Sequence, residues 1–515
     1  MGLGRSFSVA LVGLAGHIVE VEADIGQTLP AFVLLGLPDA SLTEAKDRIR
    51  SAAKNAGIPL SRRKLTINLI PASLPKKGSG FDLAMLMAAL QAAGDVRPSG
   101  STVFLAELGL DGRLRPVRGV LPAVMAAVEA GRPDVVIADG NRAEADLVPG
   151  ACVRSFSSVA ELLLAFGADP ARVVLPPEGP EEGPGPDAPA AAAGHGPDMA
   201  DIAGQQEART ALEVAAAGGH HIMLVGPPGA GKTMLAERLP GLLPDLPDHH
   251  AMEVTAVHSL SSTAAGLTQL LRRPPFENPH HTATAVSIIG GGSGMPRPGA
   301  ASRAHRGVLF LDEAPEYDRA VLDALRQPLE SGELVLHRAA GTATYPARFQ
   351  LVLAANPCPC GRSDEKGIDC TCTPTQRRRY FGKLSGPLID RIDLQLTLAR
   401  LRRSDMTSAQ GQESTALVAA RVGRARQAQR DRLGRWGHAL NAEVPAELFK
   451  GPLRLPRRMS ADLDRAMDNN VLTARGYNKV LRVAWTIADL AGQAAPDRDC
   501  VGLALAYRQN ERMAA

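Results

Sequence analysis

Hydrophobic positions along the first 168 residues follow two different periods. Short runs that are apolar throughout, or at every second position, predict strands at residues 9–12, 18–22, 32–35, 65–69, 103–107 and 135–138. Longer segments with apolar residues three and four positions apart predict helices at 41–56, 82–93, 121–130 and 159–166. The mixture of strands and helices predicts a compact α/β domain over residues 1–168.

A change in composition marks the end of this first domain. Residues 169–200 are rich in Pro, Gly, Ala and Glu, which cannot bury a core and therefore predict a linker. Residues 201–400 return to an α/β pattern, with apolar strands expected at 222–225, 308–311 and 350–355. Residues 401–515 are mostly helical, and their clearest helices are expected at 416–432, 461–469 and 476–491.

Length and composition narrow the class of protein. A chain of 515 residues is long enough for two to four domains, and 45% hydrophobic with 22% charged residues excludes a wholly disordered chain. The net charge of +3 is close to neutral, so any nucleic-acid binding must rest on local basic patches. No apolar run is long enough to span a bilayer, so no membrane partner is expected. Six cysteines are too few for a disulfide framework, which favours a reducing cytoplasm.

A glycine-rich segment follows the strand expected at 222–225 and opens a helical pattern. It comprises Gly226, Pro227, Pro228, Gly229, Ala230, Gly231, Lys232 and Thr233, which fit the phosphate-loop motif. Its glycines let main-chain N–H groups surround phosphates, Lys232 reaches the β- and γ-phosphates of ATP, and Thr233 is suited to ligate Mg²⁺. An ordinary glycine-rich turn is the alternative, but the full pattern arises by chance in such a chain with odds of roughly one in a hundred.

Acidic and amide side chains follow the other two apolar strands. Asp312 and Glu313 come directly after the strand expected at 308–311, and Asn356 follows the strand expected at 350–355. We expect Asp312 to hold Mg²⁺ through water and Glu313 to act as the general base. The amide of Asn356 is placed to orient the attacking water, although a plain Asn-Pro turn explains this residue equally well.

Several motifs together resemble a known family. Segments 201–205, 226–233, 310–313, 355–357 and 388–393 look like the magnesium-chelatase-like branch of the AAA+ ATPases. Segments 278–282, 290–293, 296–299, 323–326, 328–332 and 357–361 resemble, more narrowly, the bacterial YifB/ComM family. The resemblance extends over nearly the whole chain.

The resemblance implies a fold and an assembly. It implies an α/β multidomain chain with a Lon-protease-like domain at 1–168, a linker at 169–200, a P-loop AAA+ parallel-sheet core at 201–400 and a C-terminal helical lid at 401–515. It also implies a homo-oligomeric ring of six subunits. Arg391 corresponds to the arginine finger offered to a neighbouring subunit, and Arg475 to the lid arginine called sensor 2. From the residues alone, Arg391 could equally form an ordinary ion pair with Asp390 or Asp393.

Four of the six cysteines lie close together in the sequence. Cys358, Cys360, Cys370 and Cys372 form two Cys-x-Cys pairs, which could converge as four thiolates on a structural Zn²⁺. The spacing is tighter than the usual Cys-x₂-Cys, so reduced cysteines or a redox pair remain the alternatives. The position directly after Asn356 predicts a bracing role rather than a chemical one.

Basic residues offer candidate DNA contacts. The resemblance places residues 282–305 among loops that face a central pore, with Arg297 and Arg303 as DNA-binding candidates, while a solvated loop is the alternative. Two further clusters, at 377–379 and 421–435, suit phosphate contacts or simply exposed helix faces. His280 and His281 are expected to serve a structural or pore-loop role, because no third metal ligand accompanies them.

The N-terminal domain resembles the proteolytic domain of Lon-type proteases but departs from it at the catalytic positions. Ser79 is out of register with the expected nucleophile, and the segment that should carry the dyad lysine reads Gly119-Val120-Leu121. We therefore expect no peptidase activity. The resemblance to the YifB/ComM family implies a DNA motor or helicase that drives branch migration of recombination intermediates in natural transformation. The alternative is a chelatase-type or protein-remodelling AAA+ ATPase that does not act on DNA.

Overall fold

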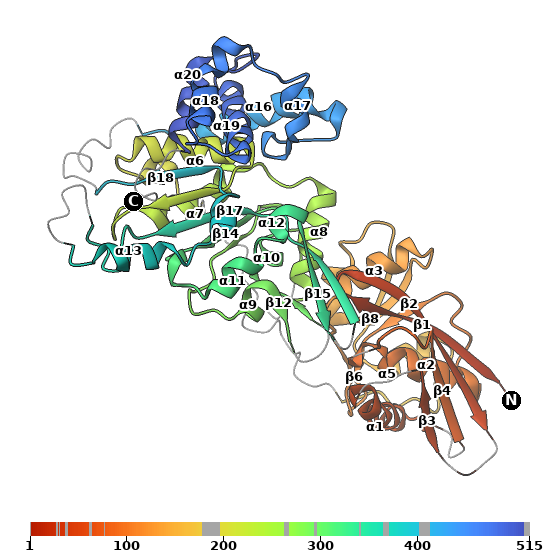
Figure 1. Ribbon diagram of the computed structural model, residues 1–515. Helices are drawn as coiled ribbons and strands as arrows, with labels where there is room; N and C mark the ends of the chain where they lie inside the picture. Colours follow the sequence, from red (N-terminus) through yellow and green to blue (C-terminus); the bar gives the residue numbers. More distant parts are fainter. Residues whose placement is uncertain are drawn as a thin grey trace.

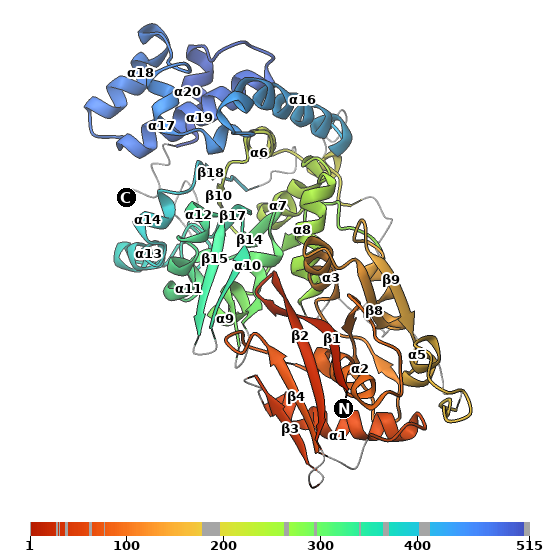
Figure 2. The same ribbon diagram turned by 90° about the vertical axis from the view of Figure 1, so that its right-hand side faces the viewer.

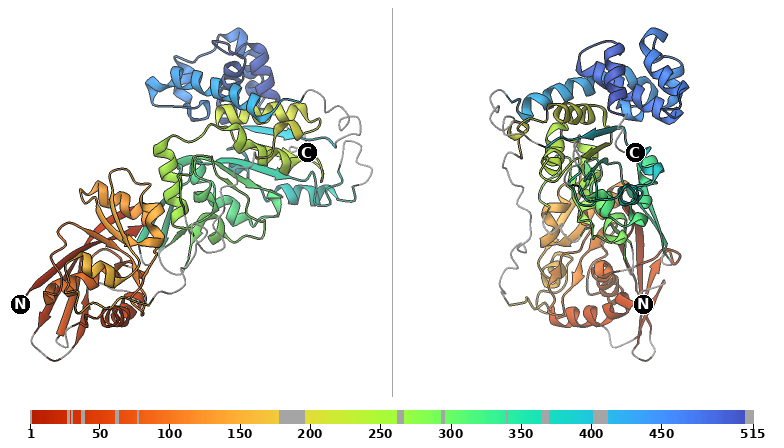
Figure 3. Two further views of the ribbon diagram at one scale, coloured as in Figure 1. Left: turned by 180° about the vertical axis from the view of Figure 1, so that it is seen from behind. Right: turned by 60° about the vertical axis from the view of Figure 1, so that its left-hand side comes forward.

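The protein is described here from a computed structural model that covers three successive parts of an elongated molecule (Figure 3). The structure describes residues 2–26, 29, 31–36, 40–60, 64–76, 78–177, 196–261, 267–292, 296–338, 341–363, 370–400 and 412–508. The middle of the linker expected at 169–200 lies outside the described residues, as do the first residues of the expected lid.

The N-terminal part is built on a seven-stranded mixed sheet in the order β3-β4-β2-β1-β5-β8-β9 (Figure 1). Its strands are β1 (Leu3–Val12), β2 (Ala15–Gly26), β3 (Phe32–Leu35), β4 (Lys64–Ile70), β5 (Val103–Leu105), β8 (Asp134–Ala138) and β9 (Cys152–Phe156). Strands β1 and β2 pair antiparallel in a hairpin, and Gly13, with φ of 67°, provides the positive φ in its turn. Strands β5, β8 and β9 are parallel to one another.

Helices cover both faces of this sheet. They are α1 (Ala40–Asn55), α2 (Asp82–Ala93), α3 (Val120–Glu129), α4 (Arg142–Ala145) and α5 (Val159–Ala165). Helix α2 is apolar on nearly all sides and is almost completely buried, because α1 covers the side that faces away from the sheet. Helix α3 packs against the opposite face and also contacts α8 of the next part (Figure 2).

The second part is a five-stranded parallel sheet in the order β11-β14-β17-β10-β18. Its strands are β10 (Ile222–Val225), β11 (Phe276–Glu277), β14 (Val308–Leu311), β17 (Gln350–Ala355) and β18 (Leu394–Thr397). Every residue of β10, β14 and β17 is buried, since helices cover both faces of the sheet. These three strands have the bounds expected from the sequence.

The helices of this second part surround the sheet. They are α6 (Gln206–Gly218), α7 (Lys232–Leu242), α8 (Asp248–Ser259), α9 (Ala285–Ile289), α10 (Ala300–Arg303), α11 (Arg319–Ala324), α12 (Pro328–Ser331), α13 (Pro374–Phe381) and α14 (Gly386–Ile389). Two antiparallel hairpins face the N-terminal part: β12 (Gly290–Gly291) with β13 (Arg297–Pro298), and β15 (Glu333–Arg338) with β16 (Gly341–Pro346) (Figure 2).

The third part is helical, with α16 (Thr415–Leu433), α17 (Ala446–Lys450), α18 (Arg457–Asp468), α19 (Ala474–Leu490) and α20 (Arg498–Ala506). Its apolar residues form one continuous hydrophobic cluster with α6 and one face of the parallel sheet. The C-terminal helices therefore pack directly on the AAA+ part (Figure 1). The α/β multidomain class predicted from the sequence is confirmed. Among the described helices, none is long and apolar enough to cross a bilayer.

Three local expectations differ from the structure. Strand β9 was missed, because its alternation is interrupted by Arg154 and Ser155. The strand expected at 103–107 is divided at Ala106 into β5 and the short β6 (Glu107–Leu108), which pairs with β7 (Leu114–Arg115). The segment 282–305, expected as a loop or hairpin, contains helices α9 and α10 as well as the β12–β13 hairpin.

Candidate nucleotide-binding and hydrolysis site

The phosphate loop joins the end of β10 to the start of α7. Gly229 and Gly231 have φ of 77° and 85°, and among the described residues a Cβ at either would meet no heavy atom within 4 Å. The first turn of α7 is not capped by a described side chain, so its main-chain N–H groups face this open space. Open space lined by main-chain donors at a helix N-terminus is the geometry that phosphates require.

Lys232 crosses the base of the loop. Its ammonium donates hydrogen bonds to the carbonyl oxygens of Gly226 at 2.6 Å and Pro227 at 3.0 Å, and to Oδ1 of Asn356 at 3.1 Å. Burial lowers the pKa of Lys232, and the carboxylates of Asp312 and Glu313 oppose that shift. Lys232 and Asn356, each assigned to the site from the sequence, are therefore brought together at the carboxyl ends of neighbouring strands.

Thr233 and Asp312 form the second contact of the site. Thr233 Oγ1 donates to Asp312 Oδ2 at 2.8 Å, which places a hydroxyl and a carboxylate side by side. These oxygen ligands fit Mg²⁺, which binds few protein groups and keeps several waters. The structure thus assembles the two residues expected to hold the metal.

Glu313 occupies an unusual backbone conformation. Its φ of 50° lies in the left-handed region, which is uncommon for a residue with a side chain and is frequent at functional positions. Its carboxylate is half exposed, and Oε2 lies 3.3 Å from Nδ1 of His281. A general base needs this kind of access to water.

The sequence interpretation gave His281 a structural or pore-loop role and missed its contact with the candidate general base. Strand β11 pairs with β14, so residues that follow β11 lie beside those that follow β14, and His281 reaches Glu313. The sequence signal was the segment 278–282 itself, and no pattern paired His281 with Glu313.

Gln205 is a second missed residue. It adopts φ of 50° just before α6, and its amide donates to the carbonyl oxygens of Ala399 at 2.8 Å and Ala230 at 3.2 Å. The amide therefore ties the phosphate loop to the segment that follows β18.

Arg391 and Arg475 lie at the opposite end of the sheet from the phosphate loop. Ile222 pairs with Leu394, and Val225 pairs with Thr397, so the segment that precedes β18 lies at the amino end of β10. About 10 Å of strand separates this edge from the phosphate loop. Both arginines line one cavity of about 360 Å³ beneath α19. Neither arginine faces the phosphate loop of its own chain.

Arg391 is held within the chain by other contacts than those weighed from the sequence. Its guanidinium pairs with Glu330 and donates to the carbonyl oxygen of Pro387 at 2.5 Å, rather than to Asp390 or Asp393. Arg475 is exposed at the start of α19. Asp393 is instead paired with Lys479 at 2.5 Å; burial alone raises the pKa of Asp393, but Lys479 and the nearby histidines hold it well below its usual value.

The four clustered cysteines converge. All four Sγ atoms lie within 4.8 Å of one another, and measured Sγ–Sγ distances are 3.3, 3.6 and 3.7 Å. Thiolates about 2.3 Å from a tetrahedral Zn²⁺ are about 3.8 Å apart, so the donor set fits zinc. Gly361 packs closely against Pro228 of the phosphate loop, where a Cβ would come within 2.8 Å of the proline ring. Residues 364–369 of this segment lie outside the described part.

The two DNA candidates differ in their surroundings. Arg303 makes a bidentate ion pair with Glu277, at 3.1 and 2.7 Å, so its charge is satisfied inside the chain and we do not carry it forward as a DNA contact. Arg297 is exposed on β13. In the basic helix α16, Arg421 pairs with Glu213, and Arg432 pairs with Asp489, so these arginines also stabilise the lid rather than face solvent freely.

Ser79 is not arranged as a nucleophile. Its hydroxyl donates to the carboxylate of Glu107. Lys76 is buried and its ammonium donates to the carbonyl oxygens of Gly36 at 3.2 Å and Leu74 at 3.1 Å, away from Ser79. Val120 and Leu121, in the segment where a dyad lysine was expected, are buried in α3. The described groups thus supply no base for Ser79 of the Ser-Lys kind.

Comparisons with known proteins cover the chain. Residues 198–406 match the family described as magnesium chelatase, subunit ChlI, residues 21–141 match subunit ChlI of Mg-chelatase, and residues 412–508 match the ChlI C-terminal family. Lon protease of Mycolicibacterium smegmatis is 27% identical over 173 residues, which cover 32% of this chain and 22% of that protein.

Two relatives match along their whole lengths. Competence protein ComM of Haemophilus influenzae is 38% identical over 520 residues, covering 100% of this chain and 99% of ComM. The uncharacterized protein YifB of Escherichia coli is 38% identical over 519 residues, covering 100% of this chain and 98% of YifB. The chain therefore belongs to the YifB/ComM family of magnesium-chelatase-like AAA+ ATPases, and this membership indicates ATP hydrolysis with Mg²⁺ in an oligomer.

Proposed function

We propose that this protein is a ring-forming, Mg²⁺-dependent ATPase that moves on DNA and promotes branch migration of recombination intermediates in natural transformation. The observation that carries the ring is the separation of Arg391 and Arg475 from the phosphate loop of their own chain. An arginine that stabilises the transition state of phosphoryl transfer must reach the γ-phosphate. Within one chain the two arginines lie at the end of the sheet away from that phosphate, which supports a contact made by a neighbouring subunit.

In the proposed reaction, the residues of one chain bind the nucleotide and activate water. The N–H groups at the start of α7 and the ammonium of Lys232 bind the phosphates, and Asn356 orients the attacking water. Thr233 and Asp312 would hold Mg²⁺, which neutralises phosphate charge when bound. Glu313 accepts the proton of the attacking water, and His281 holds its carboxylate in position.

The neighbouring chain completes the site. Arg391 exchanges its contact with Glu330 for the γ-phosphate of the adjacent subunit, and Arg475 approaches from the same face because the two line one cavity. A ring of six satisfies this requirement at every interface, which is the assembly that the family resemblance implies.

The DNA part of the proposal rests on Arg297 and on the relationship to ComM. Arg297 is exposed on the β12–β13 hairpin, where a guanidinium is suited to contact a phosphate backbone. The relative ComM is a competence protein, and the DNA substrate is proposed from that relationship.

The deciding experiment is a branch-migration assay on a labelled four-way junction, run beside ATPase rates with single-stranded, duplex and branched DNA. We expect ATPase stimulation by DNA and conversion of the junction only with ATP and Mg²⁺, and no conversion by Glu313→Gln. If the wild-type protein binds the junction and hydrolyses ATP but never moves the branch, the DNA motor is excluded and a chelatase-type or remodelling ATPase is favoured.

A further inference from the structure

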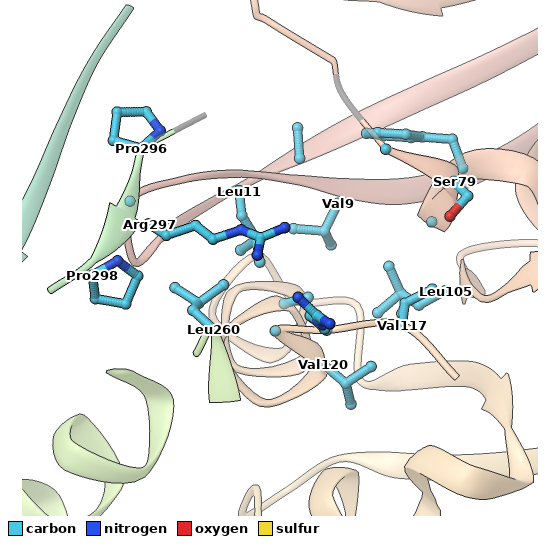
Figure 4. Close-up of a pocket in the computed structure, with 18 of the residues that line it drawn as sticks. Val9, Leu11, Ser79, Leu105, Val117, Val120, Leu260, Pro296, Arg297 and Pro298 are labelled. Carbon is cyan, nitrogen blue, oxygen red and sulfur yellow. The ribbon is translucent and has the colours of Figure 1, made fainter. Parts of the chain in front are cut away.

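A cavity of about 900 Å³ lies between the N-terminal part and the AAA+ core, away from the nucleotide site (Figure 4). Its volume is within the range of pockets that enclose a ligand of nucleotide size. The N-terminal part contributes Val9, Leu11, Leu105, Val117 and Val120 to its apolar wall. The AAA+ core contributes Leu260 and the β12–β13 hairpin, so both parts are needed to form it.

Two arginines reach this cavity from different parts of the chain. Arg297 extends from β13, between Pro296 and Pro298, towards Val9 and Leu11, while Ser79 stands at the other side (Figure 4). Arg118 lies just before α3 and also lines the cavity. Within the described residues, neither guanidinium has a hydrogen-bond or ion-pair partner, in contrast to Arg303, which is paired with Glu277. Two unpaired guanidinium groups at one cavity form a ready site for a phosphate oxygen.

The charged side chains at the cavity favour an anion without help from the N-terminus of helix α3. In the first turn of α3, the main-chain N–H of Leu121 already donates to the buried carboxylate of Glu144 at 3.2 Å. Glu107 is the acidic residue among the described lining groups. The hydroxyl of Ser79 donates to Glu107, and the nearby charge of Arg48 interacts with it. The lining therefore has an excess of positive charge.

We propose that this cavity binds a nucleotide phosphate, with Arg118 and Arg297 holding the phosphate and the apolar wall packing against the sugar and base. The nucleotide is either a unit of a DNA strand or a free mononucleotide. A DNA strand as the ligand rests on the proposed DNA motor, whereas a free mononucleotide as the ligand does not.

The site is connected to the motor by both AAA+ hairpins. Tyr345 of β16 lines the cavity, and its hydroxyl donates to the carbonyl oxygen of Pro296, next to Arg297. Gly13 in the β1–β2 turn approaches Thr344 so closely that a Cβ would come within 2.5 Å of its carbonyl oxygen. A bound phosphate would therefore contact the N-terminal part and the hairpin at once.

The test measures how tightly nucleotide probes bind to the full-length chain. One set of variants alters the charge of the cavity, and another alters its space. Arg118→Gln and Arg297→Gln remove one charge each, and Arg457→Gln, which changes an exposed arginine of the lid, is the matched control. Gly80→Leu fills the cavity, because a Cβ there meets only Val117 at 3.9 Å and Gly80 does not need a positive φ. Gly502→Leu, at an exposed and open position of α20, is its control.

Two probes distinguish the sources of the phosphate. A fluorescent oligothymidylate is measured by anisotropy over a salt series, and thymidine monophosphate is measured by calorimetry in a Lys232→Ala background that disables the phosphate loop. We expect each arginine change to lower the affinity for the probe that binds by about tenfold. For the oligonucleotide, each change should also reduce the salt slope by about one. Gly80→Leu should weaken binding without changing ATPase activity in the absence of DNA.

The outcomes separate this inference from the proposed function. If the cavity variants lose affinity for the oligonucleotide alone, the ligand is a DNA strand. If they lose affinity for thymidine monophosphate, the ligand is a free nucleotide. A different result overturns the cavity site while the DNA motor stands. In that result, Arg118→Gln, Arg297→Gln and Gly80→Leu all bind DNA as the wild type does, and no thymidine monophosphate binds. Binding of labelled casein is measured as a third probe. If the cavity variants lower the affinity for casein and for neither nucleotide probe, the cavity takes polypeptide and the proposal is wrong.

Discussion

The side-chain ammonium of Lys479 donates a hydrogen bond to the main-chain carbonyl oxygen of Arg391 at 2.8 Å. Lys479 also pairs with Asp393, whose carboxylate accepts a hydrogen bond from the main-chain N–H of His221 at 3.0 Å. Lys479 and Arg475 lie on the same helix, α19. The backbone of the proposed finger is therefore fixed to the lid helix that carries the second proposed trans-acting arginine, so any movement of α19 displaces both.

Replacing Lys479 with Ala should destabilise the junction between lid and core. Asp393 is almost fully buried and would lose its cationic partner, a change that typically costs about 3–5 kcal/mol. Thermal unfolding followed by circular dichroism should show a clearly lower Tm. Lys450→Ala, at an exposed position of α17, is the control and should leave Tm within experimental error. Equal Tm values for the two variants would show that the Asp393 pair does not hold the lid.

The sequence was sufficient for the elements that carry strong local patterns. Strands β10 and β14 are apolar at every position, and β17 is apolar after Gln350. Residues of the nucleotide site follow each of these strands, so both the strand bounds and the meeting of Lys232, Asp312 and Asn356 could be predicted from parallel-strand geometry. Helices α16 and α19 were placed within two residues of their ends for a similar reason, since their apolar periodicity is long.

Contacts between distant segments could not be predicted in the same way. The pair of His281 and Glu313 depends on which strand lies next to β14, and Arg391 with Glu330 depends on how α12 packs. The pairing of Arg303 with Glu277 likewise arises from the position of α10 beside β11. A basic residue in a sequence gives no sign of whether a carboxylate from elsewhere neutralises it.

Acidification should weaken the same junction through His221. Burial lowers the pKa of His221 to about 4, opposed by Asp393, while an unfolded histidine has a pKa of about 6.5. Below pH 6.5 the unfolded chain gains a proton that the folded chain does not, so the stability present above this pH is lost as the pH falls towards 4. At pH 5 the loss should be on the order of 1–2 kcal/mol.

Denaturant unfolding at pH 7.5 and pH 5 measures this effect. Other buried histidines, including His258 and His305, also have lowered pKa values and contribute with the same sign. His221→Gln should therefore reduce the difference between the two pH values without removing it. His17→Gln, at an exposed position of β2, should reproduce the wild-type difference, and identical pH dependence in the two variants would contradict the role of His221.

Nucleotide binding and ATP hydrolysis should be lost through different substitutions. Lys232→Ala removes the ammonium that reaches the phosphates, so nucleotide affinity should fall sharply. Glu313→Gln keeps the phosphate contacts but cannot accept a proton, so affinity should be retained while the hydrolysis rate falls by about 10²–10⁴. Binding of a fluorescent ATP analogue and phosphate release measure the two properties. Hydrolysis by Glu313→Gln at the wild-type rate would show that another group is the base.

The cysteine cluster should bind one zinc ion per chain. Because Gly361 of this segment packs against Pro228, loss of the metal should disturb the phosphate loop as well as local stability. Elemental analysis should give one zinc per wild-type chain and less in Cys360→Ser, which should also unfold at a lower temperature. Cys152→Ser, which changes an exposed cysteine elsewhere, is the control and should retain the metal. A metal-free wild-type protein with full stability and ATPase activity would exclude the zinc site.

Subunits with complementary defects should restore hydrolysis when they are mixed. Arg391→Ala chains have an intact phosphate loop but no finger, whereas Lys232→Ala chains have an intact finger but cannot bind nucleotide productively. Each preparation alone should hydrolyse ATP poorly, because every interface lacks one component. In an equal random mixture about a quarter of the interfaces combine the two intact halves, so roughly a quarter of the wild-type rate is expected if sites act independently.

The mixture also tests the position of the finger. Arg319→Ala, which changes an exposed arginine on α11 of the same part, should keep wild-type hydrolysis alone and serves as the matched control. The subunits are mixed in high salt and returned to assembly conditions, so that they exchange before phosphate release is measured. If Arg391→Ala hydrolyses ATP normally on its own, the finger is not Arg391. If Arg391→Ala is inactive and mixing restores no hydrolysis although the chains co-assemble, Arg391 acts within its own chain. That result would oppose the geometry, because Arg391 and the phosphate loop lie at opposite ends of the strands.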